Sequence, residues 1–149
     1  MKVFLINLDV DKERLAVADA QLQRLGVEYE RIPAVYGKAL SEAERRMAVN
    51  RFRWWCAIGR PILPGEIGCA LSHYHIYRRL IDESIPYACI LEDDVVLERE
   101  FKDQLAFVES RLSPKDPDVI LLSNHTKECC TTQCLKEASS IFFLQRGML

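Results

Sequence analysis

The 149-residue sequence carries little net charge, because 20 lysine and arginine residues stand against 22 aspartate and glutamate residues. A dedicated nucleic-acid-binding domain has a strong basic excess, so we expect no nucleic-acid partner. No apolar run approaches the length of a membrane span, and the N-terminal run over residues 3–8 is too short for a secretory signal peptide. We therefore expect a cytoplasmic protein whose six cysteines are reduced thiols.

Nothing in the sequence divides the chain, which has no internal repeat, low-complexity tract or linker-like stretch. Its composition, 49% hydrophobic and 28% charged, is that of a soluble globular domain. At this length one core buries about two-thirds of the surface of the unfolded chain, so folding needs no disulfide or metal. The sequence predicts one domain, or part of one, over residues 1–149.

Strand-like apolar runs alternate with apolar residues at helical spacing. The expected strands cover residues 2–8, 27–32, 87–91, 118–122 and 140–144. The expected helices run from a cap at Asp9 or Asp11 to Gly26, from the Ser41/Glu44 capping box to about residue 55, from residue 66 to before Pro86, and over residues 100–112. This alternation predicts an α/β fold with a mainly parallel sheet flanked by helices.

The acidic triplet Glu92-Asp93-Asp94 directly follows an apolar strand. Three adjacent carboxylates repel one another unless a partner compensates their charge. In an extended backbone, Glu92 and Asp94 would point to one side, where a hard divalent cation could bridge them to phosphates. Ligands also collect at the carboxyl ends of strands in open α/β sheets. The alternative interpretation is a solvated acidic turn.

Two glycines, Gly65 and Gly68, bracket the start of the third predicted helix. Glycines there permit close approach of a backbone or a ligand, and the first-turn amides offer an anion site. Glu66 and His73 lie seven residues apart and so share a helix face. His73 and His75 project from different sides and make a poor metal pair. The alternative for His73 is a histidine bonded to a carbonyl or water.

Residues 45–60 hold five arginines, two tryptophans and no acidic residue. Arginines beside aromatic side chains bind anionic acceptors or lipid head groups, with indoles at the membrane interface. A solvated helix face with buried tryptophans is the alternative. Further along, His125, Cys129, Cys130 and Cys134 could hold zinc, but their spacing matches no standard zinc motif and adjacent cysteines rarely both ligate one tetrahedral ion. We therefore expect a thiol-rich loop there.

Four segments together resemble glycosyltransferase family 25, the bacterial lipopolysaccharide-type galactosyltransferases with collagen-modifying relatives. The segments are residues 3–9 with Arg14, residues 31–37, residues 65–73 and residues 90–95. The resemblance covers about residues 1–122. It implies a GT-A-like nucleotide-sugar-binding fold in which the triplet holds Mn²⁺ or Mg²⁺ against the diphosphate of a UDP-sugar donor.

The resemblance also implies individual roles for the residues that match it. Asp94 takes the place of the metal-binding acid, Glu92 faces the ribose or the sugar, and Asp93 supports them. The segment Asn7, Leu8 and Asp9 lies near the uridine, and the helix face with Glu66 and His73 lies close to the donor.

The expected activity is therefore metal-dependent transfer of a hexose, galactose from UDP-galactose, to a lipopolysaccharide or lipooligosaccharide glycan. Family members continue with a second half that carries the acceptor contacts and the general base, so we expect residues 1–149 to be a truncated donor-binding portion without a catalytic base in view. A catalytically inactive nucleotide-sugar-binding module or partner subunit is the alternative. Contact with a lipid-linked acceptor at the inner membrane face would use residues 45–60.

Overall fold

The computed structural model describes residues 1–112, 119–121 and 141–145 of the chain. Its central sheet has the strand order β2-β1-β3-β5-β4. The strands are β1 (Lys2–Asn7), β2 (Glu30–Pro33), β3 (Tyr87–Glu92), β4 (Val119–Leu121) and β5 (Ile141–Gln145). The helices are α1 (Lys12–Leu25), α2 (Glu42–Ala48), α3 (Arg51–Ile58), α4 (Pro64–Asp82) and α5 (Phe101–Arg111).

The first three strands in the sheet order are parallel, as the alternating pattern predicts. β1 pairs in parallel with β2 on one side and with β3 on the other. β5, in contrast, pairs antiparallel with both β3 and β4. The sheet is therefore mixed rather than mainly parallel, because the apolar pattern of a strand predicts its burial and not its direction.

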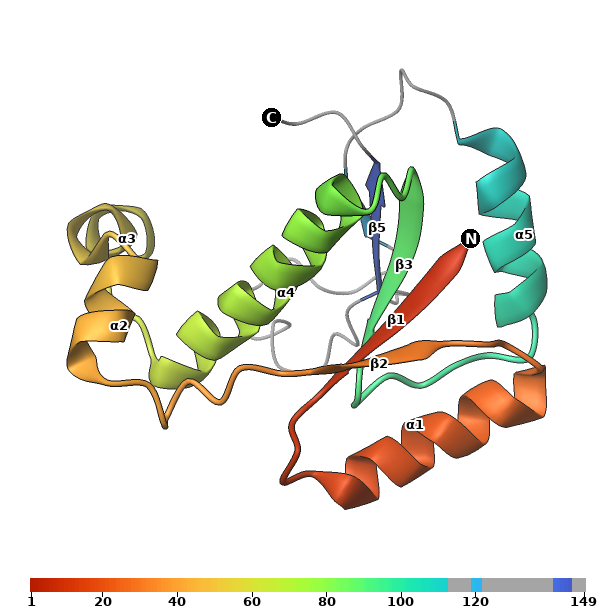
Figure 1. Cartoon of the computed structure of the whole chain (residues 1–149), viewed down its shortest axis with the longest axis horizontal. Helices are drawn as coiled ribbons and strands as arrows, with labels where there is room; N and C mark the ends of the chain where they lie inside the picture. Colours follow the sequence, from red (N-terminus) through yellow and green to blue (C-terminus); the bar gives the residue numbers. More distant parts are fainter. Residues whose placement is uncertain (113–118, 122–140, 146–149) are drawn as a thin grey trace.

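Helices cover both faces of the sheet (Figure 1). Alternate residues of β1 point to opposite faces, so that Leu5 packs with Leu22 of α1 and Phe101 of α5, whereas Phe4 packs with Ile76 of α4. α1 ends as its sequence predicts, because Gly26 adopts the left-handed conformation at φ 61° and donates its N–H to Gln23 O. The core thus lies in two layers around the parallel strands.

The predicted helix over residues 42–55 is wrong, because two helices occupy this segment. The capping box of Ser41 and Glu44 starts α2. Val49 and Asn50 are extended, and the Asn50 side chain accepts a hydrogen bond from Arg53 N at 3.0 Å. Asparagine competes well as an N-cap, so it ends one helix and starts the next. In Figure 1, α2 and α3 lie beyond the start of α4, away from the sheet.

The strand predictions over residues 118–122 and 140–144 are confirmed in their described parts, β4 and β5. The segment with His125, Cys129, Cys130 and Cys134 lies outside the described residues, so the expectation of a thiol-rich loop without zinc stays a prediction. Among the described residues, no helix is long and apolar enough to cross a membrane.

Candidate functional site

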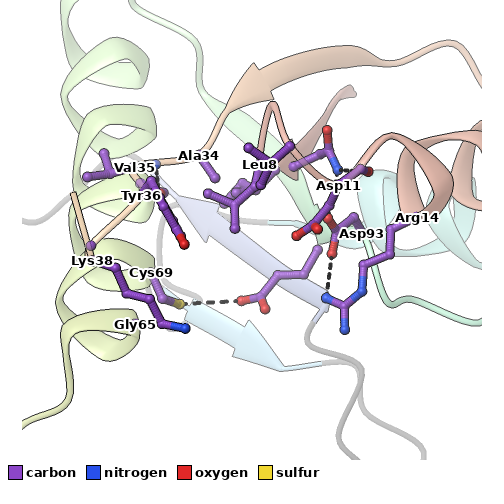
Figure 2. Close-up of a pocket in the computed structure, with 16 residues that line it drawn as sticks. Leu8, Asp11, Arg14, Ala34, Val35, Tyr36, Lys38, Gly65, Cys69 and Asp93 are labelled. Carbon is purple, nitrogen blue, oxygen red and sulfur yellow. Dashed lines mark hydrogen bonds and ion pairs between the residues drawn. The ribbon is translucent and has the colours of Figure 1, made fainter.

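A pocket of about 420 Å³ opens at the carboxyl ends of the parallel strands (Figure 2). The strand register brings these ends together, because Ile6 of β1 lies opposite both Ile32 of β2 and Glu92 of β3. Sixteen residues line the pocket: Ile6, Asn7, Leu8, Val10, Asp11, Arg14, Ala34, Val35, Tyr36, Gly37, Lys38, Gly65, Cys69, Ser72, Glu92 and Asp93. The pocket is thus built from three strand ends and the starts of α1 and α4, as expected for this fold class.

One wall of the pocket is the loop after β2, which packs backbone to backbone against α4. A Cβ atom on Gly37 would lie 1.8 Å from Pro64 O, and a Cβ atom on Gly68 would lie 2.4 Å from Val35 O. Ser72 adds a polar link, since its hydroxyl accepts from Val35 N at 2.8 Å and donates to Gly68 O at 2.7 Å. Gly68 therefore permits the approach of a neighbouring backbone rather than of a ligand.

Gly65 behaves differently from Gly68. It lines the pocket, and a Cβ atom built on it would meet nothing within 4 Å. Of the two glycines in the predicted motif, only Gly68 is thus required by packing, and Gly65 leaves the pocket mouth open beside Lys38 and Cys69 (Figure 2).

Asn7, at the end of β1, is the polar centre of the pocket floor. Its side chain is 1% exposed and donates to Asp93 Oδ2 at 2.7 Å and to Asp11 O at 3.0 Å. Its side-chain Oδ1 accepts from Arg31 Nε at 3.1 Å. Arg14 donates to the other carboxylate oxygen of Asp93 at 3.2 Å. The amide of Asn7 therefore holds Asp93 against α1.

Glu92 turns the other way, toward α4. Its Oε1 lies 3.1 Å from His73 Nε2 and accepts from Cys69 Sγ at 3.7 Å. The second ring nitrogen of His73 lies 3.4 Å from the Tyr77 hydroxyl. Burial and the neighbouring Glu92 charge raise the pKa of the Cys69 thiol to about 11. At neutral pH this cysteine is therefore a protonated thiol that donates to the carboxylate.

Asp94 lies on the turn that follows β3, where Val95 N donates to Glu92 O at 3.2 Å. Glu92 and Asp94 are thus not consecutive same-side residues of one extended strand, and this geometric prediction is wrong because the backbone turns after Glu92. Partial burial and the Glu92 charge raise the pKa of the exposed Asp94 carboxyl. Within the described ranges, Asp94 hydrogen-bonds to no other side chain.

The carboxylates of the triplet Glu92-Asp93-Asp94 suit a hard divalent cation. Carboxylate oxygens are the ligands that Mn²⁺ and Mg²⁺ prefer. Partial desolvation raises the pKa of Asp94 most and the Glu92 charge raises it further, and a nearby cation would offset that negative charge.

The structure brings only some of the predicted site residues to the pocket. Asn7, Leu8, Glu92 and Asp93 line it. His73 lies just behind Glu92 and is 7% exposed.

The other predicted residues lie outside the pocket lining. Asp9 pairs with Arg31. Glu66 accepts from Leu63 N at 2.7 Å and from Arg60, whose hydrogen bond lowers the pKa of the Glu66 carboxyl. In this structure Glu66 thus caps α4, and its predicted donor contact stays a prediction.

Sequence reasoning did not select Arg14, Tyr36 and Lys38 as site residues, although all three line the pocket. The signal for Arg14 is its place in the first turn of the helix that follows β1. The signal for Tyr36 and Lys38 is the loop that follows β2, since loops after neighbouring parallel strands share one edge.

Comparison with known proteins identifies the family to which the chain is similar. A family model described as "Glycosyltransferase family 25 (LPS biosynthesis protein)" matches residues 1–147. Procollagen galactosyltransferase 1-B of Xenopus laevis is 32% identical over 126 residues, which cover 81% of this chain and 21% of the relative.

Two further relatives show similar coverage. Human procollagen galactosyltransferase 2 is 33% identical over 70% of this chain and 17% of its own length. A "Glycosyltransferase 25 family member" of Aedes aegypti is 35% identical over 71% of this chain and 18% of its own length. The chain therefore spans about a fifth of the length of these curated relatives.

Proposed function

Because the chain belongs to glycosyltransferase family 25, we propose that it forms the donor-binding part of a hexosyltransferase that uses UDP-galactose. The family assignment confirms the resemblance found in the sequence. The galactosyltransferase names of the relatives support the choice of sugar. The observation that carries the proposal is the pocket at the strand ends, which places Asn7, Glu92 and Asp93 around one cavity.

The proposed fold type is GT-A-like, supported by the three parallel strands with helices on both faces. In this proposal the β1 end, with Asn7 and Leu8, lies near the uridine, and Glu92 faces the ribose or the sugar. Asn7 and Arg14 hold Asp93 in place through hydrogen bonds of 2.7 and 3.2 Å. Such preorganised side chains lower the entropic cost of binding a donor.

Asp94 would hold Mn²⁺ or Mg²⁺, which supplies charge stabilisation of the departing diphosphate when bound. Its exposure at the turn leaves its carboxylate accessible to a ligand. Lys38 and Arg14 at the pocket add positive charge that favours an anionic donor.

For the acceptor we propose a lipopolysaccharide or lipooligosaccharide glycan, in line with the family description. Contact with a lipid-linked acceptor at the cytoplasmic face of a membrane would use α2 and α3. Met47 and Phe52 there are 88% and 77% exposed, and arginines flank them. Apolar and arginine side chains together favour a membrane surface.

Calorimetric titration of UDP with and without Mn²⁺ tests the donor proposal. We expect joint binding of UDP and Mn²⁺, lost in Asp94→Asn because one fewer carboxylate weakens a hard-cation site. Asp82→Asn, an exposed aspartate at the far end of α4, is the matched control and should bind normally. Equal UDP affinity of Asp94→Asn and the parent with Mn²⁺ would refute the assignment of Asp94.

Labelled UDP-galactose and UDP-glucose, offered with lipooligosaccharide-type and procollagen-type acceptors, test the sugar and the acceptor. Galactose transfer to the lipooligosaccharide acceptors supports the proposal. Transfer to the procollagen-type acceptors instead would show that the acceptor is of the procollagen type and not a lipooligosaccharide glycan. Joint binding of UDP and Mn²⁺ without any transfer by residues 1–149 is the result expected of a donor-binding part without a catalytic base.

A further inference from the structure

A second cluster of ligating side chains lies beside the acidic triplet, where α4 meets the end of β3. We propose that Cys69, His73 and Glu92 form a binding site for a zinc-class ion whose fourth coordination position faces the pocket. The three ligand atoms all lie within 4.8 Å of one another. This inference goes beyond the proposed function, since the hard-cation site at Asp94 requires neither Cys69 nor His73.

The spacing of the ligand atoms suits a tetrahedral ion. With metal–ligand distances of about 2.0 Å to nitrogen and oxygen and about 2.3 Å to sulfur, tetrahedral edges are about 3.3 Å for N to O and about 3.5 Å for S to O. The structure has 3.1 Å between His73 Nε2 and Glu92 Oε1, and 3.7 Å between Cys69 Sγ and the same oxygen. Both spacings to Glu92 Oε1 thus lie within about 0.2 Å of the tetrahedral edges, and the third, between Cys69 Sγ and the His73 ring nitrogen, is no more than 4.8 Å.

The elements hold these ligands in place. Cys69 and His73 lie four residues apart on α4 and so share a helix face. Glu92 is fixed by the register of β3 with β1, in which it pairs with Ile6. The Tyr77 hydroxyl lies 3.4 Å from His73 Nδ1, the kind of outer partner that orients a metal-binding imidazole.

The ligand chemistry distinguishes this site from the triplet. A thiolate and an imidazole select zinc over Mg²⁺ and Mn²⁺, which prefer oxygen. Binding converts the Cys69 thiol to a thiolate, and its proton passes to the solvent.

The positions of the three ligands determine where the open coordination position of the ion faces. Cys69 and Glu92 line the pocket, and His73 lies behind them. Three protein ligands with one open position are typical of zinc sites that take a water or substrate oxygen. The open position would therefore accept an oxygen from a molecule in the pocket, and Glu92 would contact that molecule through the ion.

Cobalt(II) titration without UDP or Mn²⁺ tests the site, because a cobalt–thiolate bond has a characteristic charge-transfer absorption. The full-length chain is used with Cys129, Cys130 and Cys134 replaced by serine, so that only Cys56, Cys69 and Cys89 remain as thiols. We expect one equivalent of Co²⁺ to give this absorption and Zn²⁺ to displace it. Cys69→Ser in this background should abolish the absorption, and Cys56→Ser, an exposed cysteine on α3, should retain it.

Tyr77→Phe keeps the aromatic ring but removes the hydroxyl near His73. The substitution should weaken zinc binding about 10-fold or more. Circular dichroism establishes that each variant is folded; if Cys69→Ser is not, Cys69→Ala takes its place. The site is refuted if the absorption survives loss of Cys69, or if the parent gives none and Zn²⁺ does not protect Cys69 from alkylation. Because UDP and Mn²⁺ are absent, failure here leaves the donor proposal standing.

Discussion

The loop after β2 and the helix pair α2–α3 both contact α4, but they are held in different ways. The loop meets α4 through glycine backbones and a buried serine, Ser72. Neither α2 nor α3 contains a buried residue. These helices rely on caps and on exposed ion pairs such as Arg51 with Glu42, and exposed pairs contribute little stability.

The loop after β2 therefore forms a rigid wall of the pocket, whereas α2 and α3 form an exposed surface. Close backbone packing tolerates no added atom, so the loop positions Val35 and Tyr36 at the pocket with little freedom. The α2–α3 pair leaves the polar atoms Arg45 Nε and Trp54 Nε1 buried without a hydrogen-bond partner in the described part of the chain. The exposed apolar side chains on these helices, such as Met47 at 88% and Phe52 at 77%, are suited to contact with a surface outside the domain.

The largest expected effect is that of Gly68→Ala. Its Cβ would lie 2.4 Å from Val35 O and 2.7 Å from Gly37 N, both backbone atoms that cannot turn aside. Overpacking of this kind costs about 1–3 kcal/mol, which urea unfolding would detect. Gly65→Ala is the control, because its Cβ meets nothing within 4 Å; it should be neutral or slightly stabilising. Equal losses in both variants would contradict the role assigned to backbone contact.

Asn7→Ala should have the next largest effect. The substitution removes the donor to Asp93 and Asp11 and the acceptor for Arg31. Polar groups that lose a buried partner cost about 1–3 kcal/mol. Asn50→Ala on α3 removes only an exposed N-cap bond, at about 1 kcal/mol. Chemical denaturation compares the two, and a larger loss for Asn50 would reverse the contrast between the regions.

Sequence reasoning predicted the part of the fold that local patterns encode. The βαβ opening, the Gly26 end of α1 and the strand before the triplet are all present. The break at Asn50 was not predicted, because apolar spacing continues across it and the competing cap is a single side chain. The antiparallel direction of β5 depends on pairing with β3, which no local pattern encodes.

The sequence predicted where the candidate site lies but not which residues contact one another within it. A strand end followed by carboxylates correctly indicated the pocket edge. The opposite directions of Glu92 and Asp93 depend on partners 19 and 86 residues away, His73 and Asn7. Gly68 was expected to admit a backbone or a ligand, and only the structure identifies the neighbour as Val35 and Gly37.

Phe52→Ser on α3 should leave the free energy of unfolding unchanged within about 0.5 kcal/mol, because Phe52 is 77% exposed. Its effect should instead appear in cosedimentation with vesicles that contain anionic lipid, since the proposed membrane contact loses an apolar side chain. Val17→Ser on α1, at 62% exposure, is the control and should bind vesicles as the parent does. The membrane proposal fails if both variants bind alike, or if the parent does not bind.

Asp94→Asn should have a small effect on stability in the absence of metal. Partial burial and the Glu92 charge raise the pKa of Asp94 in the folded state. The ionised carboxylate therefore destabilises the fold at neutral pH. Below the ordinary pKa of an aspartate both states are protonated, and the destabilisation disappears.

Removing the charge should consequently stabilise the protein at pH 7, by no more than about 0.5 kcal/mol because the side chain is exposed. The gain should vanish as the pH falls below the ordinary aspartate range, and thermal unfolding followed from pH 3 to pH 7 would measure it. Asp82→Asn, which removes an exposed partner 3.7 Å from Arg78, should not stabilise at any pH. A loss of stability in Asp94→Asn at pH 7 would show that its carboxylate is already compensated without a cation.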